Sequence, residues 1–211
     1  DGTIEFWVKP DWAANSKNFN PAVLANRDTS GTRYSIHIRR NLNGVDLWNG
    51  SQVGTVLYNF EQGNWYHVAL VETGTSAEVF INGEFHGSMS WGFSAATGKD
   101  FHIGSSDGTR EFFEGEIDEV RIWNKARTQT EIQDNLYQKL SGTESGLVAY
   151  YNFDKDSVDG NTVSDITENV NDGTLTNGNG DNFVDSEIPT FKGHVDIELD
   201  QKVTNQPGII L

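Results

Sequence analysis

The 211-residue sequence contains no cysteine. It therefore forms no disulfide bond and holds neither a catalytic thiol nor cysteine-ligated zinc. No apolar run approaches the roughly 20 residues that a membrane-spanning helix needs. Catalytic-serine and phosphate-loop signatures are also missing, and the five histidines show no close metal-binding spacing. These absences exclude several classes of enzyme and of metal site.

Positive charge is scarce. The chain has 15 Lys and Arg residues against 31 Asp and Glu residues, with a formal net charge of -16 and a pI near 4.5. Such a chain repels phosphate backbones and anionic lipids, so we expect no nucleic-acid partner and no membrane insertion. Carboxylates clustered in loops also suit calcium, a cation that prefers oxygen ligands. Solubility alone would explain the same acidity, and both interpretations stay open.

Short alternating apolar segments recur along the chain, separated by turns rich in its 22 glycines. In the segment 78–86, Asn82-Gly83 predicts a type I′ hairpin turn, because both residues tolerate positive φ. Strands at this spacing favour an all-β sandwich or jelly roll. The predicted strands cover residues 3–9, 22–25, 34–39, 45–48, 53–58, 65–72, 78–86, 101–104, 115–123, 146–153, 173–175 and 194–200.

One helix interrupts the strands. Thr128 and Glu131 have the spacing of a capping box, and Gly142 marks the expected end of the helix. Apolar residues follow the cap at four-residue spacing: Ile132, Leu136 and Leu140. The sequence therefore predicts a single short helix in a chain of strands.

Three segments, in this order, resemble a known superfamily: TIEFWVKP, then WYHVALVE leading to EVFINGEFHG, and then FEGEIDEVRIWNKARTQTEIQ. They look like the concanavalin A-like jelly rolls of the laminin G and pentraxin type, in the bacterial form. The resemblance covers about residues 1–178. It implies a sandwich of two antiparallel sheets with one short helix against an edge.

The segment GLVAYYNFD, followed by SDITENVNDGTLTNG, departs from the family pattern. In the family it often opens a module, whereas here it follows the helix. We interpret 1–211 as one laminin G-like module in which 146–211 supply late strands, because this leaves no strand edge unpaired. The alternative is a main module at 1–145 and the start of a second module at 146–211. Because Asp1 opens almost directly into a strand, we also expect a piece of a larger multidomain chain.

The stretch GEIDEVRIW places Glu116 and Asp118 at alternate positions of a strand, as in some glycosidases. Laminarinase-type enzymes share the fold that the resemblance implies. Here, however, Val120 and Arg121 stand where the second glutamate would be expected, and strand alternation points Glu119 to the opposite face from Asp118. The catalytic pair is incomplete, so we predict no catalytic residue and no enzyme.

The resemblance gives Asp118 another role, because an aspartate of a late strand in related jelly rolls often binds a structural calcium. Asp154 ends the YYNFD strand, and an Asp- and Asn-rich loop follows it. Calcium takes six to eight oxygen ligands, which such loops supply, although the same residues also form turns without a metal. The candidate calcium ligands are Asp118, Asp154, Asp165, Asn171 and Asp172.

Three of the six tryptophans lie in or beside polar loops, whereas the other three lie in predicted strands and are expected in the core. Loop aromatics can stack on sugar rings while nearby carboxylates and amides bind the hydroxyls, or they can plug the ends of a sandwich. The candidate ligand-binding residues are Trp12, Trp48, Trp91 and Asp107.

Together these observations predict a non-catalytic, calcium-supported module that binds a carbohydrate or an extracellular protein. We expect it in a secreted or cell-surface, adhesin-like protein. The first alternative is a structural spacer without a glycan site, in which Trp48 and Trp91 would be buried and calcium would alter stability alone. The second is a glycoside hydrolase of the laminarinase type.

Overall fold

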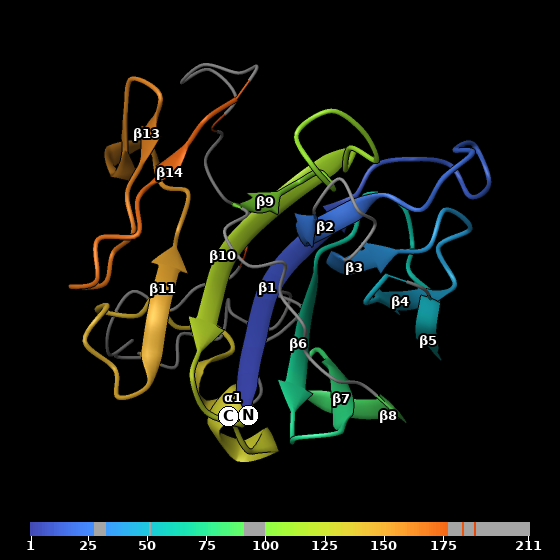
Figure 1. The fold of residues 1–211 in the computed structure, drawn as a ribbon, viewed down its shortest axis with the longest axis horizontal. Helices are drawn as coiled ribbons and strands as arrows, with labels where there is room; N and C mark the ends of the chain where they lie inside the picture. The colour runs from blue at the N-terminus through green and yellow to red at the C-terminus, as the bar shows by residue number, and fades with distance from the viewer. Residues whose placement is uncertain (28–32, 51, 91–99, 177–182, 184–187, 189–211) are drawn as a thin grey trace, which may run out of the picture.

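The computed structural model describes residues 1–27, 33–50, 52–90, 100–176, 183 and 188 (Figure 1). The described chain is almost entirely β. Its elements are β1 (Gly2–Pro10), β2 (Ala22–Arg27), β3 (Arg33–Ile38), β4 (Gly44–Trp48), β5 (Gln52–Leu57), β6 (Tyr66–Glu72), β7 (Ser76–Ile81), β8 (Glu84–Ser90), β9 (Phe101–Ile103), β10 (Gly115–Trp123), α1 (Gln129–Asn135), β11 (Leu147–Tyr151), the 3₁₀ turn η1 (Lys155–Ser157), β12 (Val158–Asp159), β13 (Thr162–Val163) and β14 (Gly173–Thr174).

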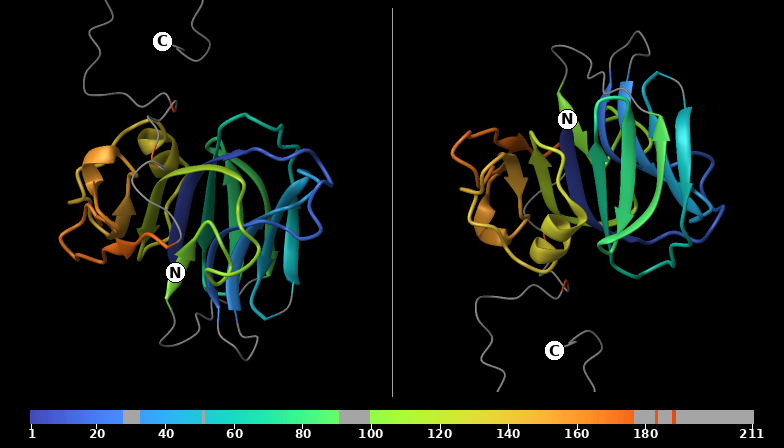
Figure 2. Two further views of the ribbon diagram at one scale, coloured as in Figure 1. Left: turned by 90° about the horizontal axis from the view of Figure 1, so that it is seen from above. Right: turned by 90° about the horizontal axis from the view of Figure 1, so that it is seen from below.

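Two large antiparallel sheets pack face to face, as Figure 2 shows. Sheet A has the strand order β11-β10-β1-β6-β7-β8, and sheet B has the order β5-β4-β3-β2-β9. A small sheet of β12, β13 and β14 lies with α1 on the β10–β11 side of the molecule (Figure 2). Among the described residues, the predicted all-β sandwich of two antiparallel sheets with one short helix is confirmed.

Strand alternation separates an inner and an outer face on each sheet. In β3, Tyr34, Ile36 and Ile38 point into the core, whereas Ser35 and His37 point outward. Residues at the centre of the core, such as Phe6 and Ile36, are fully buried. Burying side chains of this kind contributes about 1.5–3 kcal/mol each, so the space between the two sheets is the main source of stability.

The local turn and cap signatures of the sequence hold in the structure. Asn82 and Gly83 have φ values of 52° and 78° between β7 and β8, which is the predicted hairpin turn. Thr128 and Glu131 form both hydrogen bonds of a capping box. The helix ends at Asn135, well before the predicted Gly142. Within the described residues, no helix is long and apolar enough to cross a membrane.

The strand predicted from Gly146 becomes β11, which pairs with β10 at the edge of sheet A. That pairing agrees with the interpretation in which the late segment completes this module. The division of the chain into modules stays a prediction, and the strand predicted at 194–200 lies outside the described residues.

A β-bulge in β10 corrects one prediction. Trp7 pairs with Asp118 and Glu5 pairs with Arg121, so two residues of β10 oppose the single residue between Glu5 and Trp7. Glu119 supplies the extra residue and has a φ of 51°. The bulge resets the alternation, and the Glu119 carboxylate reaches the same outer face as Arg121, to which it binds at 2.6 Å. Asp118 lies opposite Trp7, which is also on the outer face, so Asp118 and Glu119 share this face. The prediction that Glu119 points to the opposite face from Asp118 was therefore wrong.

A cluster of buried charges covers the outer face of sheet A beneath α1. Glu5 is completely buried, and its Oε1 accepts hydrogen bonds from Arg127 at 2.7 Å and from the Trp123 indole at 3.0 Å. The Arg121 guanidinium lies 3.7 Å from the same oxygen. Burial, together with the two guanidiniums, lowers the pKa of His67 well below its ordinary value, so this neighbouring imidazole is neutral.

The same two arginines fasten the helix to the sheet. Arg121 donates to the Asn135 carbonyl at 3.0 Å and to the Gln138 carbonyl at 2.5 Å. Arg127 donates to the Glu131 carbonyl and to the Asn135 side chain. Arg121 therefore lies at the negative end of the helix, where the last carbonyls lack intrahelical partners, whereas Arg127 reaches from the first turn of the helix to the Asn135 side chain.

We expect Glu5→Gln to lower the free energy of unfolding by about 3 kcal/mol, because it leaves the buried Arg127 guanidinium without its carboxylate and Arg121 with Glu119 alone. Urea denaturation measures this loss. Lys17→Gln is the control, since it removes only a surface ion pair with Glu114 and should cost less than about 1 kcal/mol. Equal losses in the two variants would contradict a special role for Glu5.

Candidate functional site

The outer face of sheet B carries a band of polar and aromatic side chains. Register aligns His102, Ala25, Ser35 and Trp48 in one row across β9, β2, β3 and β4. The next row runs through Ala22, His37, Asp46 and Thr55. On this face β2 carries small residues, whereas β3 to β5 carry larger polar and aromatic residues. The side chains that can form hydrogen bonds therefore lie over the β3–β5 half of the face.

Asp46 is the centre of this band. Its carboxylate is only 1% exposed, yet it accepts a hydrogen bond from Asn20 Nδ2 at 2.7 Å and another from the Thr55 hydroxyl. The Arg39 guanidinium lies 3.7 Å away. A buried carboxylate is stable only with such partners, so these contacts hold Asn20 and Thr55 in fixed positions.

The position of His37 is equally defined. Its Nδ1 lies 2.8 Å from the Asn20 carbonyl oxygen, which can only accept, so Nδ1 carries the proton. Its Nε2 is hydrogen-bonded to the Ser35 hydroxyl at 2.8 Å. These two contacts fix the plane of the ring.

Trp48 lies beside this polar group at the end of β4. Its indole is half-buried and meets the His37 ring edge-to-face, with ring centroids 6.3 Å apart. The remaining surface of the indole is accessible next to the network of Asn20, Asp46 and Thr55. The arrangement presents a flat apolar surface bordered by hydrogen-bonding groups, which is the composition of many small-ligand sites. We call Trp48, His37, Asp46, Asn20 and Thr55 the sheet B site.

Asp107 lies in the loop between β9 and β10, on the same side of the molecule as sheet B. Its carboxylate contacts Arg110 at 2.9 Å and Arg27 at 3.8 Å. Burial alone would raise the pKa of Asp107, but hydrogen bonds from Thr109 and the two guanidiniums outweigh burial and lower it. Asp107 is therefore an anion already engaged in fixing its own loop.

The other two candidate ligand-binding residues fall elsewhere. Trp12 is only 2% exposed, packs edge-to-face on Phe113 and donates its indole N–H to the Arg40 carbonyl at 3.1 Å. A sugar ring cannot reach it, so the prediction of a surface role for Trp12 was wrong and it plugs the sandwich instead. Trp91 lies outside the described residues.

Three of the candidate calcium ligands meet in one loop, around Asp165. The Asp165 carboxylate accepts five hydrogen bonds from three residues: the Tyr150 and Asn171 backbone N–H groups at 3.0 Å, the Thr167 N–H and hydroxyl at 2.9 Å, and the Asn171 side-chain amide at 3.2 Å. Asp172 accepts from the Asp165 N–H at 2.9 Å. Burial would raise the pKa of Asp165, but the backbone donors outweigh it and lower the pKa.

The remaining two candidates, Asp118 and Asp154, gather around a lysine. Both oxygens of Asp154 contact the Lys139 ammonium, at 2.5 and 2.7 Å. Asp118 accepts the Glu119 backbone N–H at 2.8 Å. Burial would lower the pKa of Lys139, but Asp154, with further contributions from Glu119 and Asp118, raises it. The ammonium group of Lys139 thus supplies the positive charge that these carboxylates need.

These five residues do not fit a calcium site. Calcium needs several oxygens with free lone pairs converging on one point, whereas the Asp165 carboxylate is surrounded by N–H donors and Asp154 by an ammonium. Among the residues that the structure describes, no group of three or more His, Asp or Glu side chains is suited to a metal ion.

The carboxylates considered for glycoside hydrolysis are also engaged. Glu116 binds the Lys9 ammonium at 2.8 Å, and Asp118 is 7% exposed. Glu119 is 2% exposed and accepts from Arg121 and Tyr150. None of the three lines either of the cavities found in the described part of the chain. The geometry therefore offers hydrolysis no support.

Sequence analysis missed most of the sheet B site. The alternation YSIHIR does show that Ser35 and His37 face away from the core, and the pattern GVDLW does the same for Asp46 and Trp48. The pairing of β3 with β4 brings these residues together, and Asn20 arrives from a loop. Neither fact can be read from a single strand.

The stability that Asp165 contributes should depend on pH. Its pKa is depressed in the folded chain, so the contribution is present above the ordinary value of 3.8 and is lost as the pH falls through the folded value. The difference in unfolding free energy between the wild-type chain and Asp165→Asn should therefore be larger at pH 6 than at pH 2.5. Urea denaturation at both pH values tests this, and an unchanged difference would contradict it.

We expect calcium and chelator to leave the melting temperature of the wild-type chain unchanged, because Lys139 already balances Asp154. Lys139→Met should lower the melting temperature by leaving Asp118 and Asp154 without that cation. A tightly bound calcium would instead raise the wild-type melting temperature by about 5–10 °C when present at a hundred times its Kd. Calorimetry with and without chelator distinguishes the two, and a shift of that size would restore the calcium prediction.

Comparisons with known proteins agree with this fold. A protein of Bacteroides ovatus, described as a candidate carbohydrate binding protein, superposes with a TM-score of 0.66 and 23% identity over 82% of this chain. The match covers 53% of that protein, so this chain spans about half its length. The receptor binding domain of botulinum neurotoxin type G has a TM-score of 0.50 and 12% identity, over 78% of this chain and 48% of that one. These likenesses show the fold alone.

Sequence comparison identifies the family. No curated protein matches the chain. A laminin G-type family model, described as the concanavalin A-like lectin/glucanases superfamily, matches residues 1–133, which is more than half of the chain. The chain therefore belongs to the concanavalin A-like lectin/glucanases superfamily.

Proposed function

We propose that this chain is a non-catalytic carbohydrate-binding module and that the sheet B site is its contact surface. The observation that carries the proposal is the half-buried Trp48 indole held against His37, next to the fixed network around Asp46. Sugars combine apolar C–H faces with hydroxyl groups. A ring can stack on the indole while its hydroxyls exchange hydrogen bonds with Asn20 and Thr55, which are partly exposed and are held in place by the buried Asp46.

The rigidity of this site favours binding. Asn20, Asp46, Thr55 and His37 are tied to one another and to the strands, so a ligand would order few side chains on arrival. Association usually costs about 0.5–1.5 kcal/mol for each flexible side chain that is immobilised. A prearranged surface avoids most of that cost, and the Arg39 side chain, 31% exposed at its rim, adds donors for hydroxyl groups.

The proposal includes no calcium ion, because the candidate ligands do not fit one. Secretion or display on a cell surface, an adhesin-like parent and a place in a longer chain accompany the proposal as expectations from the sequence. The spacer alternative predicts that Trp48 is buried. Its half-buried indole favours the binding module instead. An extracellular protein remains the second partner class, to be decided by the experiment below.

Glycan-array binding of the labelled chain, followed by calorimetric titration of the best glycan, tests the proposal. Trp48→Ala should weaken binding at least tenfold, because stacking on the indole is lost; tenfold corresponds to about 1.4 kcal/mol. Phe85→Ala is the matched control. Phe85 is an aromatic residue 51% exposed on the other sheet, and its removal should leave the affinity unchanged.

Two outcomes would overturn the proposal. One is an array without any bound glycan, which would favour the protein-binding or spacer role. The other is a glycan whose affinity does not change in Trp48→Ala while the circular dichroism spectrum stays that of the wild type. That result would place the glycan elsewhere on the molecule.

A further inference from the structure

The sheet B site has more hydrogen-bond donors than acceptors to offer a ligand. The Asn20 amide donates one N–H to Asp46 at 2.7 Å, and its Oδ1 already accepts the Arg40 backbone N–H at 3.0 Å. Both ring nitrogens of His37 are engaged within the protein. The second N–H of the Asn20 amide remains for a ligand. So do the terminal nitrogens of Arg39, whose Nε is the atom that lies 3.7 Å from Asp46.

Arg40 adds a second guanidinium beside Asn20. Its side chain is exposed, and its guanidinium donates to the Lys17 backbone carbonyl at 3.3 Å. Every other arginine side chain that the structure describes lies 3.8 Å or less from a carboxylate. In a chain with a net charge of -16, Arg40 is therefore a positive charge that the surrounding carboxylates do not neutralise.

The backbone of Arg40 is held by the loop that also supplies Asn20. Its N–H donates to Asn20 Oδ1, and its carbonyl accepts from the Asn15 N–H at 2.8 Å and from the Trp12 indole at 3.1 Å. Asn20 in turn donates to Asp46, so one side chain joins Arg40 to the centre of the site. The fold therefore fixes the place from which the Arg40 side chain extends.

Register gives the length of the surface between the indole and the guanidiniums. Ser35 lies opposite Trp48, and Arg39 lies four residues further along the same chain segment, just after β3. The Arg39 side chain is on the same outer face, because it approaches Asp46. At roughly 3.3 Å per residue, the two ends are about 13 Å apart. A single sugar ring stacked on Trp48 does not cover this length, whereas two or more linked sugars can.

The charge at the Arg39 end of this surface is positive. Asp46 offsets Arg39, and Glu114 offsets Lys17, which leaves the charge of Arg40. The acidity of the rest of the chain acts weakly here, because charges further than about 8 Å are largely screened at physiological ionic strength. A guanidinium can donate two parallel hydrogen bonds to an anionic group, and such bonds are about twice as strong as those to neutral acceptors.

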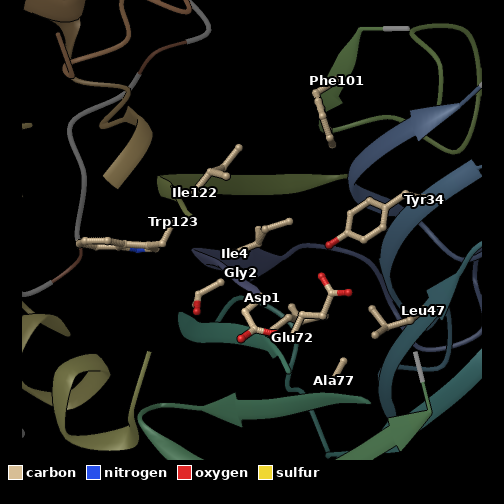
Figure 3. Close-up of a pocket in the computed structure, with 12 residues that line it drawn as sticks. Asp1, Gly2, Ile4, Tyr34, Leu47, Glu72, Ala77, Phe101, Ile122 and Trp123 are labelled. Carbon is tan, nitrogen blue, oxygen red and sulfur yellow. The ribbon is translucent and has the colours of Figure 1, made fainter. Parts of the chain in front are cut away.

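The cavity between the two sheets is unsuited to an anionic ligand. It has a volume of about 480 Å³, and the Tyr34 hydroxyl points toward the Glu72 carboxylate across it (Figure 3). The described residues that line this cavity are mostly apolar and include no Lys, Arg or His. An anion that entered it would meet a carboxylate without a compensating cation among these residues.

We propose that the sheet B site binds an acidic glycan of at least two sugar units. One ring stacks on Trp48, and a carboxylate or sulfate group of the glycan accepts hydrogen bonds from Arg40 and Arg39. This inference rests on the proposed function and names the class of its ligand. It makes the charged group a determinant of specificity, because the donors at this end of the site bind a neutral hydroxyl more weakly than an anionic oxygen.

An array that pairs each acidic glycan with its neutral counterpart tests the ligand class. Glycans with uronic or sialic acids stand beside their carboxyl-reduced forms, and sulfated glycans beside their desulfated forms. By calorimetric titration, the acidic member of the bound pair should have roughly tenfold higher affinity, because its charged group gains charge-assisted hydrogen bonds. The pair that responds shows whether the group is a carboxylate or a sulfate.

Substitutions then assign the preference to Arg40. Arg40→Gln should lower the ratio of the acidic to the neutral affinity at least fivefold. Lys125→Gln is the matched control: it changes the net charge equally, but Lys125 binds Glu131 beside α1, so the ratio should stay as in the wild type. Trp48→Ala should weaken both members of a pair alike and leave the ratio unchanged, because stacking does not depend on the charged group.

The outcomes separate this inference from the proposed function. Glycan binding that depends on Trp48 but shows equal affinities for the acidic and neutral members would overturn the acidic-ligand inference and leave the carbohydrate-binding module standing. A ratio that falls equally in Arg40→Gln and Lys125→Gln would also overturn it, since net charge alone would then explain the preference. An array without any bound glycan would overturn both.

Discussion

A single buried carboxylate, that of Glu5, organises one whole side of this molecule. It lies on the strand at the middle of sheet A, and neutralising it requires the guanidiniums of Arg121 and Arg127. Those guanidiniums in turn need acceptors, which α1 provides through the carbonyls of Asn135 and Glu131. These contacts join sheet A to the helix. If one charge of the cluster loses its partner, another charge is left buried without full compensation. The bulge at Glu119 belongs to the same arrangement, because it turns a second carboxylate toward Arg121.

The outer faces of the two sheets differ as a result. The outer face of sheet A is occupied by the helix and its charges, so its carboxylates are structural even though they alternate as catalytic residues would. In the part of the chain that the structure describes, no helix covers the outer face of sheet B, and the polar residues of this face are held by hydrogen bonds among themselves and with the loop that carries Asn20. Trp48 remains accessible at the margin of that network. A stable scaffold on one face and a shaped surface on the other is how sandwich folds commonly present their binding residues.

Short-range features of the fold were predictable from sequence, because their causes are local. Asn82-Gly83 specifies its turn through φ, and Thr128 with Glu131 specifies the helix start through two hydrogen bonds. The bulge at Glu119 was not predictable, since an uninterrupted alternation in sequence looks the same with or without an extra residue. Trp12 was misjudged because its neighbours are polar although its ring is buried. Asp165 was predicted to bind calcium because the side-chain oxygens of Asp and Asn can bind a cation. The same oxygens can instead accept hydrogen bonds from backbone N–H groups, and a sequence does not distinguish the two uses.

The Lys139 contact has a consequence for where such a module can operate. In a site that relies on a metal, occupancy depends on the concentration of that metal outside the protein. Here the cation is covalently part of the chain, so folding alone brings it to the carboxylate. The ammonium stays charged far above neutral pH, because Asp154 raises its pKa. Dilution, chelating polymers and changes in mineral content would then leave this part of the sandwich unaltered, whereas high salt would weaken it.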